Sequence, residues 1–213
     1  MGAIDFKKID KELYSPGPAP SLIRVPAMQF IMADGKGDPN DQAGEYAAAV
    51  ELLYGLSYGI RMSPKNGPAP QGYFEYVVPP LEGLWWRNDD SMDFTEKDKF
   101  YWTVMIRQPD FVDEAVFSAA KDALSHKKKN LDVSKARLVT WDEGLCVQLM
   151  HTGPYKDESA SIAQIVAFVS ANGLAEDICD TRRHHEIYLG DPRKTAPEKL
   201  KTVLRHPVKR LEY

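Results

Sequence analysis

The stretch HHEIYLGDP, residues 184–192, decides how the rest of this sequence is read. HHEIYL has the length and composition of a β-strand, and the glycine and proline after it predict a turn. Successive side chains of a strand point to opposite faces of the sheet. The face that we expect to pack on helices carries His185, Ile187 and Leu189. The face that we expect to stay open carries His184, Glu186 and Tyr188.

A second stretch, GYFEYVVPP at 72–80, repeats the pattern of a strand with an internal glutamate. Each half of the chain has the order strand with a glycine turn, helix, strand with a glutamate, and this order suggests duplicated βαββ units. Chance similarity between short runs is the alternative. In the first half the residue pattern predicts strands at 28–35, 72–80, 81–86 and 99–108, and a helix at 45–60. In the second half it predicts a hairpin at 137–153, a helix at 158–173 and a strand at 184–189.

The predicted fold class is therefore α+β, with duplicated βαββ units forming one antiparallel sheet, helices on one face and a central ligand cleft. An N-terminal arm, 1–26, precedes a single domain, 27–213. Its pseudo-repeats are about 27–108 and 137–213, linked by a helix at 111–127. In TAPEKLKTVLRHP, Thr195 and Glu198 form a capping box, which predicts a short helix. Pro207 would end that helix, and residues 208–213 would form a last strand.

Composition narrows the classes of protein that fit. The chain has 213 residues and a net charge of -4, which argues against a nucleic-acid partner. No segment approaches the roughly 20 apolar residues of a membrane span, and no signal peptide is visible, so we expect a cytoplasmic protein without a membrane partner. Cys146 and Cys179 are expected to be structural thiols. The oligomeric state is open, and a homodimer is one of the assemblies that the sequence permits.

Aromatic side chains surround the two strand glutamates. Tyr73 shares a face with Glu75, and Tyr188 shares one with Glu186. Aromatic walls around a carboxylate suit a flat, hydrophobic small molecule, aromatic or cationic. Trp85, Tyr101 and Trp141 are candidate wall residues, although core packing is the alternative for any one tryptophan.

The alternative for Glu186 is a solvated glutamate or an ion pair with Arg182 or Arg183. No histidine pair has metal-site spacing, so neither a metal nor a cofactor is expected.

HTGPYKDE at 151–158, together with HHEIYLGDPRKTAPEKLKTVLRHPV at 184–208, resembles the GyrI-like small-molecule-binding family. That family has a SOUL-like fold and is related to the effector-binding domains of multidrug-sensing transcription regulators. The second stretch resembles the stand-alone branch that includes cyclopropanoid cyclopropyl hydrolases, which open the cyclopropane of yatakemycin-like DNA alkylators. No helix-turn-helix fits into the short arm, which speaks against a direct transcriptional role.

The resemblance implies that Glu186 meets the ligand, and it matches Tyr155 and Glu158 to two further family positions. We hypothesise a cofactor-independent hydrolase, in which Glu186 is the base or positions the water. Tyr155 and Glu158 would be a donor, a second carboxylate or orienting partners. The alternative is a non-catalytic binder or sensor of hydrophobic or cationic drugs that uses the same cleft.

Overall fold

The computed structural model describes residues 2–88 and 96–211. Its helices are α1 (Phe6–Ile9), α2 (Lys11–Tyr14), α3 (Glu45–Met62), α4 (Glu114–Lys127) and α5 (Ser159–Ala171). Its strands are β1 (Ser21–Val25), β2 (Met28–Lys36), β3 (Leu81–Trp86), β4 (Tyr101–Arg107), β5 (Arg137–Trp141), β6 (Gly144–Thr152), β7 (Leu174–Glu176), β8 (His184–Tyr188) and β9 (Lys201–Arg210). The predicted α+β class, with antiparallel strands and packed helices, is confirmed.

The chain forms two compact units. Unit 1 contains Met1–Ile9, Met28–Leu81 and Trp86–Trp141. Unit 2 contains Asp10–Ala27, Glu82–Trp85 and Asp142–Tyr213. The predicted boundaries of the arm and of the two repeats remain predictions.

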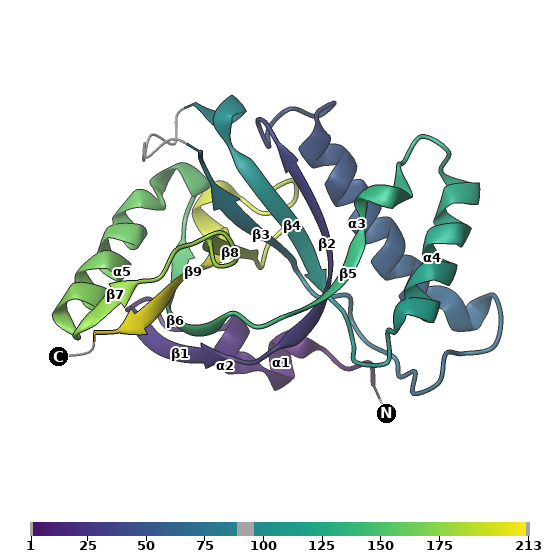
Figure 1. Cartoon of the computed structure of the whole chain (residues 1–213), viewed down its shortest axis with the longest axis horizontal. Helices are drawn as coiled ribbons and strands as arrows, with labels where there is room; N and C mark the ends of the chain where they lie inside the picture. The colour runs from purple at the N-terminus through teal and green to yellow at the C-terminus, as the bar shows by residue number, and fades with distance from the viewer. Residues whose placement is uncertain (1, 89–95, 212–213) are drawn as a thin grey trace. The chain divides into compact units, whose positions relative to one another are not determined.

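Unit 1 is built on β2, which pairs antiparallel with β4 on one side and β5 on the other. Helix α3 packs on β2 and β4, and α4 packs on α3, as Figure 1 shows. Both helices were predicted. Helix α4 begins at Glu114 because the Asp113 side chain accepts a hydrogen bond from the Val116 N–H and caps the helix.

In unit 2 the strands lie in the order β1-β6-β9-β8-β3, and β7 pairs with the far end of β9. All of these pairs are antiparallel. Strand β9 is central and pairs with three partners along its length, so it fixes the register of β6, β7 and β8 together.

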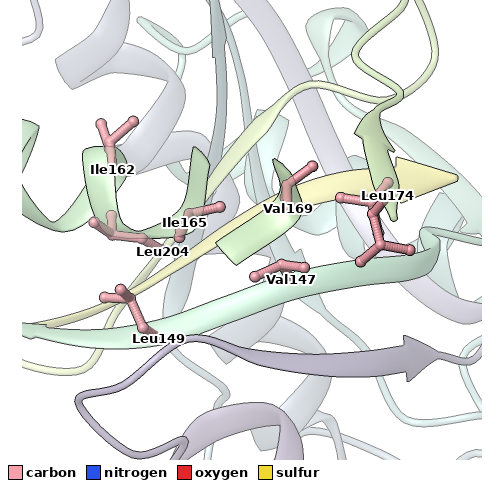
Figure 2. Close-up of a cluster of buried hydrophobic side chains, with 8 residues drawn as sticks. Val147, Leu149, Ile162, Ile165, Val169, Leu174 and Leu204 are labelled. Carbon is pink, nitrogen blue, oxygen red and sulfur yellow. The ribbon is translucent and has the colours of Figure 1, made fainter. Parts of the chain in front are cut away.

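Helix α5 covers one face of this sheet. Figure 2 shows its apolar side chains facing those of the strands. The buried cluster comprises Val147, Leu149, Ile162, Ile165, Val169, Leu174, Leu204 and Val208. The row Leu149–Leu204–Glu186 crosses three paired strands. Paired residues of antiparallel strands point to the same face, so Glu186 lies on the helix-covered face.

The predicted assignment of the two strand faces is therefore wrong. His184, Glu186 and Tyr188 share the face of α5, whereas His185 and Ile187 point to the opposite one. That opposite face is covered by the segment around α2, where Leu13 and Tyr14 are buried. The Leu13 carbonyl accepts a hydrogen bond from Arg205, and the Glu12 carbonyl accepts one from Gln148.

The predicted helix at 195–207 is also wrong. Only Pro197–Lys199 makes a short 3-10 turn, and β9 then runs from Lys201 to Arg210. Residues 202–208 are buried without interruption, because both faces of β9 are covered, and this burial outweighs the local capping signal. Pro207 fits in the strand because pairing with β8 ends at Arg205, so the missing N–H leaves no ladder bond unmade there. Residues 212 and 213 of the predicted last strand lie outside the described residues.

Two strand predictions need correction. The strands of the expected 137–153 hairpin exist, but β5 pairs with β2, and β6 pairs with β1 and β9. Glu143, which was expected in the solvated turn of this hairpin, is instead buried between charged partners. Segment 72–80 is not a strand, and Tyr76 makes only an isolated bridge to Ile4. Tandem prolines there prevent a regular ladder.

No helix within the described residues is both long enough and apolar enough to cross a membrane.

Candidate functional site

Glu186 sits in the middle of β8 with both carboxylate oxygens engaged. Oε2 accepts a hydrogen bond of 2.8 Å from the Tyr188 hydroxyl, and Oε1 lies 3.0 Å from His184 Nε2. The side chain keeps 14% of its surface exposed. Glu186 is thus held in a fixed orientation and still open to a ligand or a water molecule.

Trp85 fixes the direction of the Tyr188 hydrogen bond. The indole N–H can only donate, and it donates to the Tyr188 hydroxyl at 2.8 Å, so the tyrosine proton is directed to Glu186. The indole reaches over Gly83, which pairs with Glu186 on the neighbouring strand. A Cβ at Gly83 would lie 2.7 Å from Trp85 Nε1, so glycine is required there.

The HTGPY turn places Tyr155 and Glu158 at the start of α5. Gly153 adopts φ +142, a region that favours glycine, and lets the chain leave β6 for the helix. His151 stabilises this turn, because its ring nitrogens lie 3.0 Å from Ser161 Oγ and 3.3 Å from the Pro154 carbonyl. The Tyr155 ring meets the Tyr188 ring edge-on, with centroids 5.7 Å apart.

Glu158 is a buried acid beside a second carboxyl group. Only 7% of its surface is exposed. Burial, and then the negative charge of Glu186, raise the pKa of Glu158 far above its ordinary range, against a smaller effect of the Thr202 hydroxyl. Glu158 is therefore protonated at neutral pH. Burial and the nearby Glu158 and Glu186 also raise the pKa of Tyr155 to about 12.

Two buried polar atoms of this site, Glu158 Oε1 and Thr202 Oγ1, make no hydrogen bond of ordinary geometry to the described residues, although the Thr202 hydroxyl lies near enough to the Glu158 carboxyl group to lower its pKa. Thr202 pairs in register with Tyr188 on one side and His151 on the other, so it faces the same side as Glu186. Buried polar atoms are almost always satisfied, and exceptions mark places where water or a ligand completes the bonding. These two atoms are therefore candidate contacts for a water molecule or for a polar group of a ligand.

A chain of titratable side chains continues from Glu186 across the sheet. His184 Nδ1 lies 2.8 Å from His206 Nε2, and His206 Nδ1 lies 2.5 Å from Glu176 Oε1. Burial lowers the pKa of His206, and the hydrogen bond from His206 lowers the pKa of Glu176. His206 was not among the expected site residues, because the residue pattern predicted a helix there. Strand parity on β9 would have put it opposite His184.

The other face of β8 holds a fully buried ionic cluster that the sequence analysis also missed. His185 lies 2.9 Å from Glu143 and 3.0 Å from Glu82, and Arg205 lies 2.7 Å from Glu143. Burial opposes charge on Glu143, but His185 and Arg205 outweigh it and lower the pKa of Glu143 to about 2. Burial likewise opposes charge on His185, and Glu143 and Glu82 raise its pKa to about 9. The cluster pairs His185 and Arg205 with the carboxyl groups of Glu82 and Glu143, and it anchors β8 on the face opposite Glu186.

The structure therefore brings five of the nine expected site residues into unit 2: Tyr155, Glu158, Glu186, Tyr188 and Trp85. The other four belong to unit 1: Tyr73, Glu75, Tyr101 and Trp141.

The four unit 1 residues have separate surroundings. Tyr101 stacks on Trp86, and Trp141 contacts Phe30 edge-on. Tyr73 donates to the Arg61 carbonyl. Glu75 is exposed.

Within residues 2–88 and 96–211, no group of three or more metal-ligating side chains is arranged to hold a metal ion. The two neighbouring imidazoles hydrogen-bond to each other instead.

In this α+β protein an acid pair flanked by tyrosines lies on the helix-covered face of an antiparallel sheet. The GyrI-like small molecule binding domain matches residues 18–209, and the chain belongs to the GyrI-like family.

Among solved structures, a conserved protein from Listeria innocua described as uncharacterized is 47% identical, with a TM-score of 0.92 over 97% of this chain and 100% of that one. A hydrolase from Listeria innocua is 46% identical, with a TM-score of 0.87 and the same coverage. The EcmrR C-terminal domain is 13% identical, with a TM-score of 0.54 over 90% of this chain and 98% of that one, and shares the fold. No curated protein matches the chain.

Proposed function

We propose that this protein is a cofactor-independent hydrolase that opens the cyclopropane of electrophilic DNA-alkylating natural products by adding water, and so detoxifies them. The observation that carries the proposal is the pair of unlike carboxyl groups. Glu158 retains its proton, whereas Glu186 accepts a hydrogen bond from Tyr188. Sites whose environments separate two titratable groups in this way supply one acid and one base.

The chemistry follows from these two states. In a cyclopropane conjugated to a dienone, water attacks the ring carbon and a carbon–carbon bond breaks. Its electron pair moves through the dienone to the carbonyl oxygen, which becomes a phenol oxygen. Glu158 donates its proton to that oxygen, and Glu186 takes one proton from the attacking water. The product is the ring-opened alcohol, with one water added in total.

Aromatic side chains support the substrate class. Tyr155 and Tyr188 meet edge-on, and Trp85 is tied to Tyr188. Together they offer ring faces and edges to a flat apolar molecule, as aromatic-lined ligand sites do.

The similarity to a Listeria innocua protein described as a hydrolase, 46% identical over nearly the whole chain, supports the reaction class.

The test is incubation with a yatakemycin-type alkylator in ¹⁸O-labelled water, followed by mass spectrometry of the products. The wild type should release a ring-opened product that carries one labelled oxygen. Glu186→Gln and Glu158→Gln should each lower turnover on the order of 10² to 10⁴-fold, the contribution typical of a general acid or base. Glu198→Gln, an exposed glutamate of the same unit, is the matched control. Unchanged turnover in Glu186→Gln would remove this residue from the mechanism.

A second candidate function is binding without catalysis. The carboxylate of Glu186 beside aromatic rings also suits a cationic drug, which it would hold by charge and by cation–π contact. A binder would return the alkylator unchanged, and cationic dyes would quench its aromatic fluorescence without turnover.

A further inference from the structure

We propose that Thr202 is a positioning residue for Glu158: its hydroxyl donates a hydrogen bond to the carboxylate that forms when this acid gives up its proton. The role deepens the proposed hydrolase function and rests on it, because Glu158 is the proton donor of that reaction. Thr202 was not among the expected site residues, because the residue pattern predicted a helix there.

Backbone pairing places Thr202 close to the start of α5. On β9 it pairs with Tyr188 of β8 and with His151 of β6, so its side chain points to the helix-covered face of the sheet. The turn between β6 and α5 is tied to the start of β9, because the Gly153 N–H donates to the Leu200 carbonyl at 3.0 Å. The acid at the start of α5 therefore lies near enough to the Thr202 hydroxyl to be affected by it.

The Thr202 hydroxyl is buried and unused in the ligand-free site. Thr202 is 0% exposed, and its Oγ1 makes no hydrogen bond of ordinary geometry to the described residues. The same holds for the Oε1 atom of Glu158. A buried hydroxyl without a partner makes a fold less stable than valine of the same shape would. The hydroxyl is therefore an advantage only in a state of the site that gives it a partner.

Ionised Glu158 is such a state. Burial, and then the negative charge of Glu186, oppose the ionised form and raise the pKa of Glu158. The Thr202 hydroxyl acts in the opposite direction, because a donor beside a carboxylate stabilises the charged form. Without this hydroxyl Glu158 would be a weaker acid and would transfer its proton to the substrate less readily.

The hydrogen bond forms during the reaction, and the protons balance. The O–H bond of Glu158 breaks, and its proton passes to the carbonyl oxygen of the substrate. The Thr202 hydroxyl keeps its own proton and directs it to the new carboxylate. Hydrogen bonds of acid–base sites are often loose in the ligand-free enzyme and tighten in the complex. Glu186 gains one proton from the attacking water, so the two carboxyl groups together neither gain nor lose one.

A structural water that bridges the Thr202 hydroxyl and Glu158 Oε1 is the alternative. The two accounts predict opposite effects on stability. If such a water holds the two residues together at rest, Thr202→Val removes one of its partners and destabilises the fold. If the hydroxyl has no partner at rest, the methyl group of valine replaces it without loss.

The first experiment compares Thr202→Val with Thr103→Val in urea denaturation at neutral pH. Thr103 is the matched control, a strand threonine that is 6% exposed and whose hydroxyl donates to Asp34 at 2.6 Å. Its replacement removes an existing hydrogen bond, so the urea midpoint should fall while kcat stays unchanged. Thr202→Val should keep or raise the midpoint. A midpoint that falls in Thr202→Val as it does in the control overturns the proposal.

The second experiment measures the pH–rate profile on the alkylator. In Thr202→Val, kcat should fall about 10- to 100-fold, the loss expected for one hydrogen bond to a charged group. The decline of the rate in alkali should also move to higher pH, because Glu158 becomes a weaker acid. Thr202→Ser keeps the hydroxyl and should restore both properties. An unchanged profile in Thr202→Val, or a loss that serine does not restore, contradicts the proposal.

The pH effect is specific to the hydroxyl, because neither variant alters the other titratable groups around it. These groups include Glu186 and Tyr188 of β8, Tyr155 of the preceding turn and His151 of β6.

The third experiment needs no activity and separates this proposal from the hydrolase. ¹³C NMR of glutamate-labelled protein follows the ionisation of Glu158, and Glu158→Gln assigns its signal. Thr202→Val should raise the pKa of Glu158 above that of the wild type, whereas Thr202→Ser should not. An unchanged titration overturns the role of Thr202. If the wild type forms no product, the hydrolase proposal fails instead, and this titration still decides whether Thr202 stabilises the carboxylate.

Discussion

Replacing Glu143 by Gln tests whether the buried ionic cluster behind β8 stabilises the fold. Glu143 is 2% exposed and contacts both His185 and Arg205. Glutamine keeps the size and one acceptor of the side chain but removes the charge. Arg205 then stays buried and cationic without its nearest anion, which is the costly way to break a buried pair.

The magnitude follows from the pKa of Glu143, which falls from an ordinary 4.5 to about 2. At about 1.36 kcal/mol per pKa unit, the cluster favours the ionised carboxylate by about 3 kcal/mol. This agrees with the roughly 3 to 5 kcal/mol lost when one partner of a buried ion pair is removed. We expect the free energy of unfolding to drop by about 3 kcal/mol at neutral pH.

The pH dependence has a definite sign. The folded-state pKa of Glu143 is lowered, so its contribution is present above its unfolded value of 4.5 and is lost as pH falls through about 2. The pKa of His185 is raised to about 9, so its contribution is complete below its unfolded value of 6.5 and is lost as pH rises through about 9. The difference between wild type and Glu143→Gln should be largest between these two unfolded values and shrink in alkali.

The measurement is urea denaturation followed by circular dichroism at about pH 5.5 and about pH 9.5, a choice set by the two windows above. Glu198→Gln should unfold like the wild type at both. Our account of the cluster fails if Glu143→Gln costs less than about 0.5 kcal/mol at the lower pH, the size of an ordinary surface substitution. It also fails if the loss of stability does not shrink in alkali.

Three further predictions concern the site and its support. Gly83→Ala should break the hydrogen bond between Trp85 and Tyr188, because the new methyl group would overlap the indole; a changed tryptophan fluorescence spectrum and weaker ligand binding would report this. Hydrolysis should decline as pH rises through the raised pKa of Glu158, and Glu158→Gln should abolish that limb of the pH–rate profile. Leu149→Ala, in the core under α5, should lower the free energy of unfolding by about 2 to 5 kcal/mol in thermal or urea denaturation, and a loss under 1 kcal/mol would contradict the packing.

The helices and strands in which apolar residues recur at regular spacing were predicted from the local sequence pattern. Helices α3, α4 and α5 and strands β2, β3, β4 and β8 lie where the residue pattern placed them, because apolar spacing and glycine stops are properties of a short segment. Segment 195–207 was assigned wrongly for the same reason. Its capping signal is local, whereas the partners that make β9 a central strand lie far away in the sequence.

The candidate site could be predicted from the sequence only in part, for a related reason. Alternation placed His184, Glu186 and Tyr188 on one face, and that grouping holds in the hydrogen bonds they share. Alternation does not say which face a helix will cover, since an apolar side chain such as Ile187 can also pack on a loop. The segment around α2 covers that second face, and nothing within β8 identifies it.

The side chains of β8 alternate between the two faces of the sheet. One face anchors the strand, and the other carries the candidate site, so each face constrains the other. Its odd position, His185, is clamped between Glu82 and Glu143, which fixes the strand along its axis and against rotation. The side chains of His184, Glu186 and Tyr188 then point toward α5. There the Tyr188 hydroxyl and His184 Nε2 lie within hydrogen-bond distance of the two carboxylate oxygens of Glu186. A shift of one residue in register would exchange the faces and bury Glu186 among the charges behind the sheet. The ionic cluster therefore acts as a register lock for the candidate site, and a loss of His185 should disturb Glu186 without any contact between the two side chains.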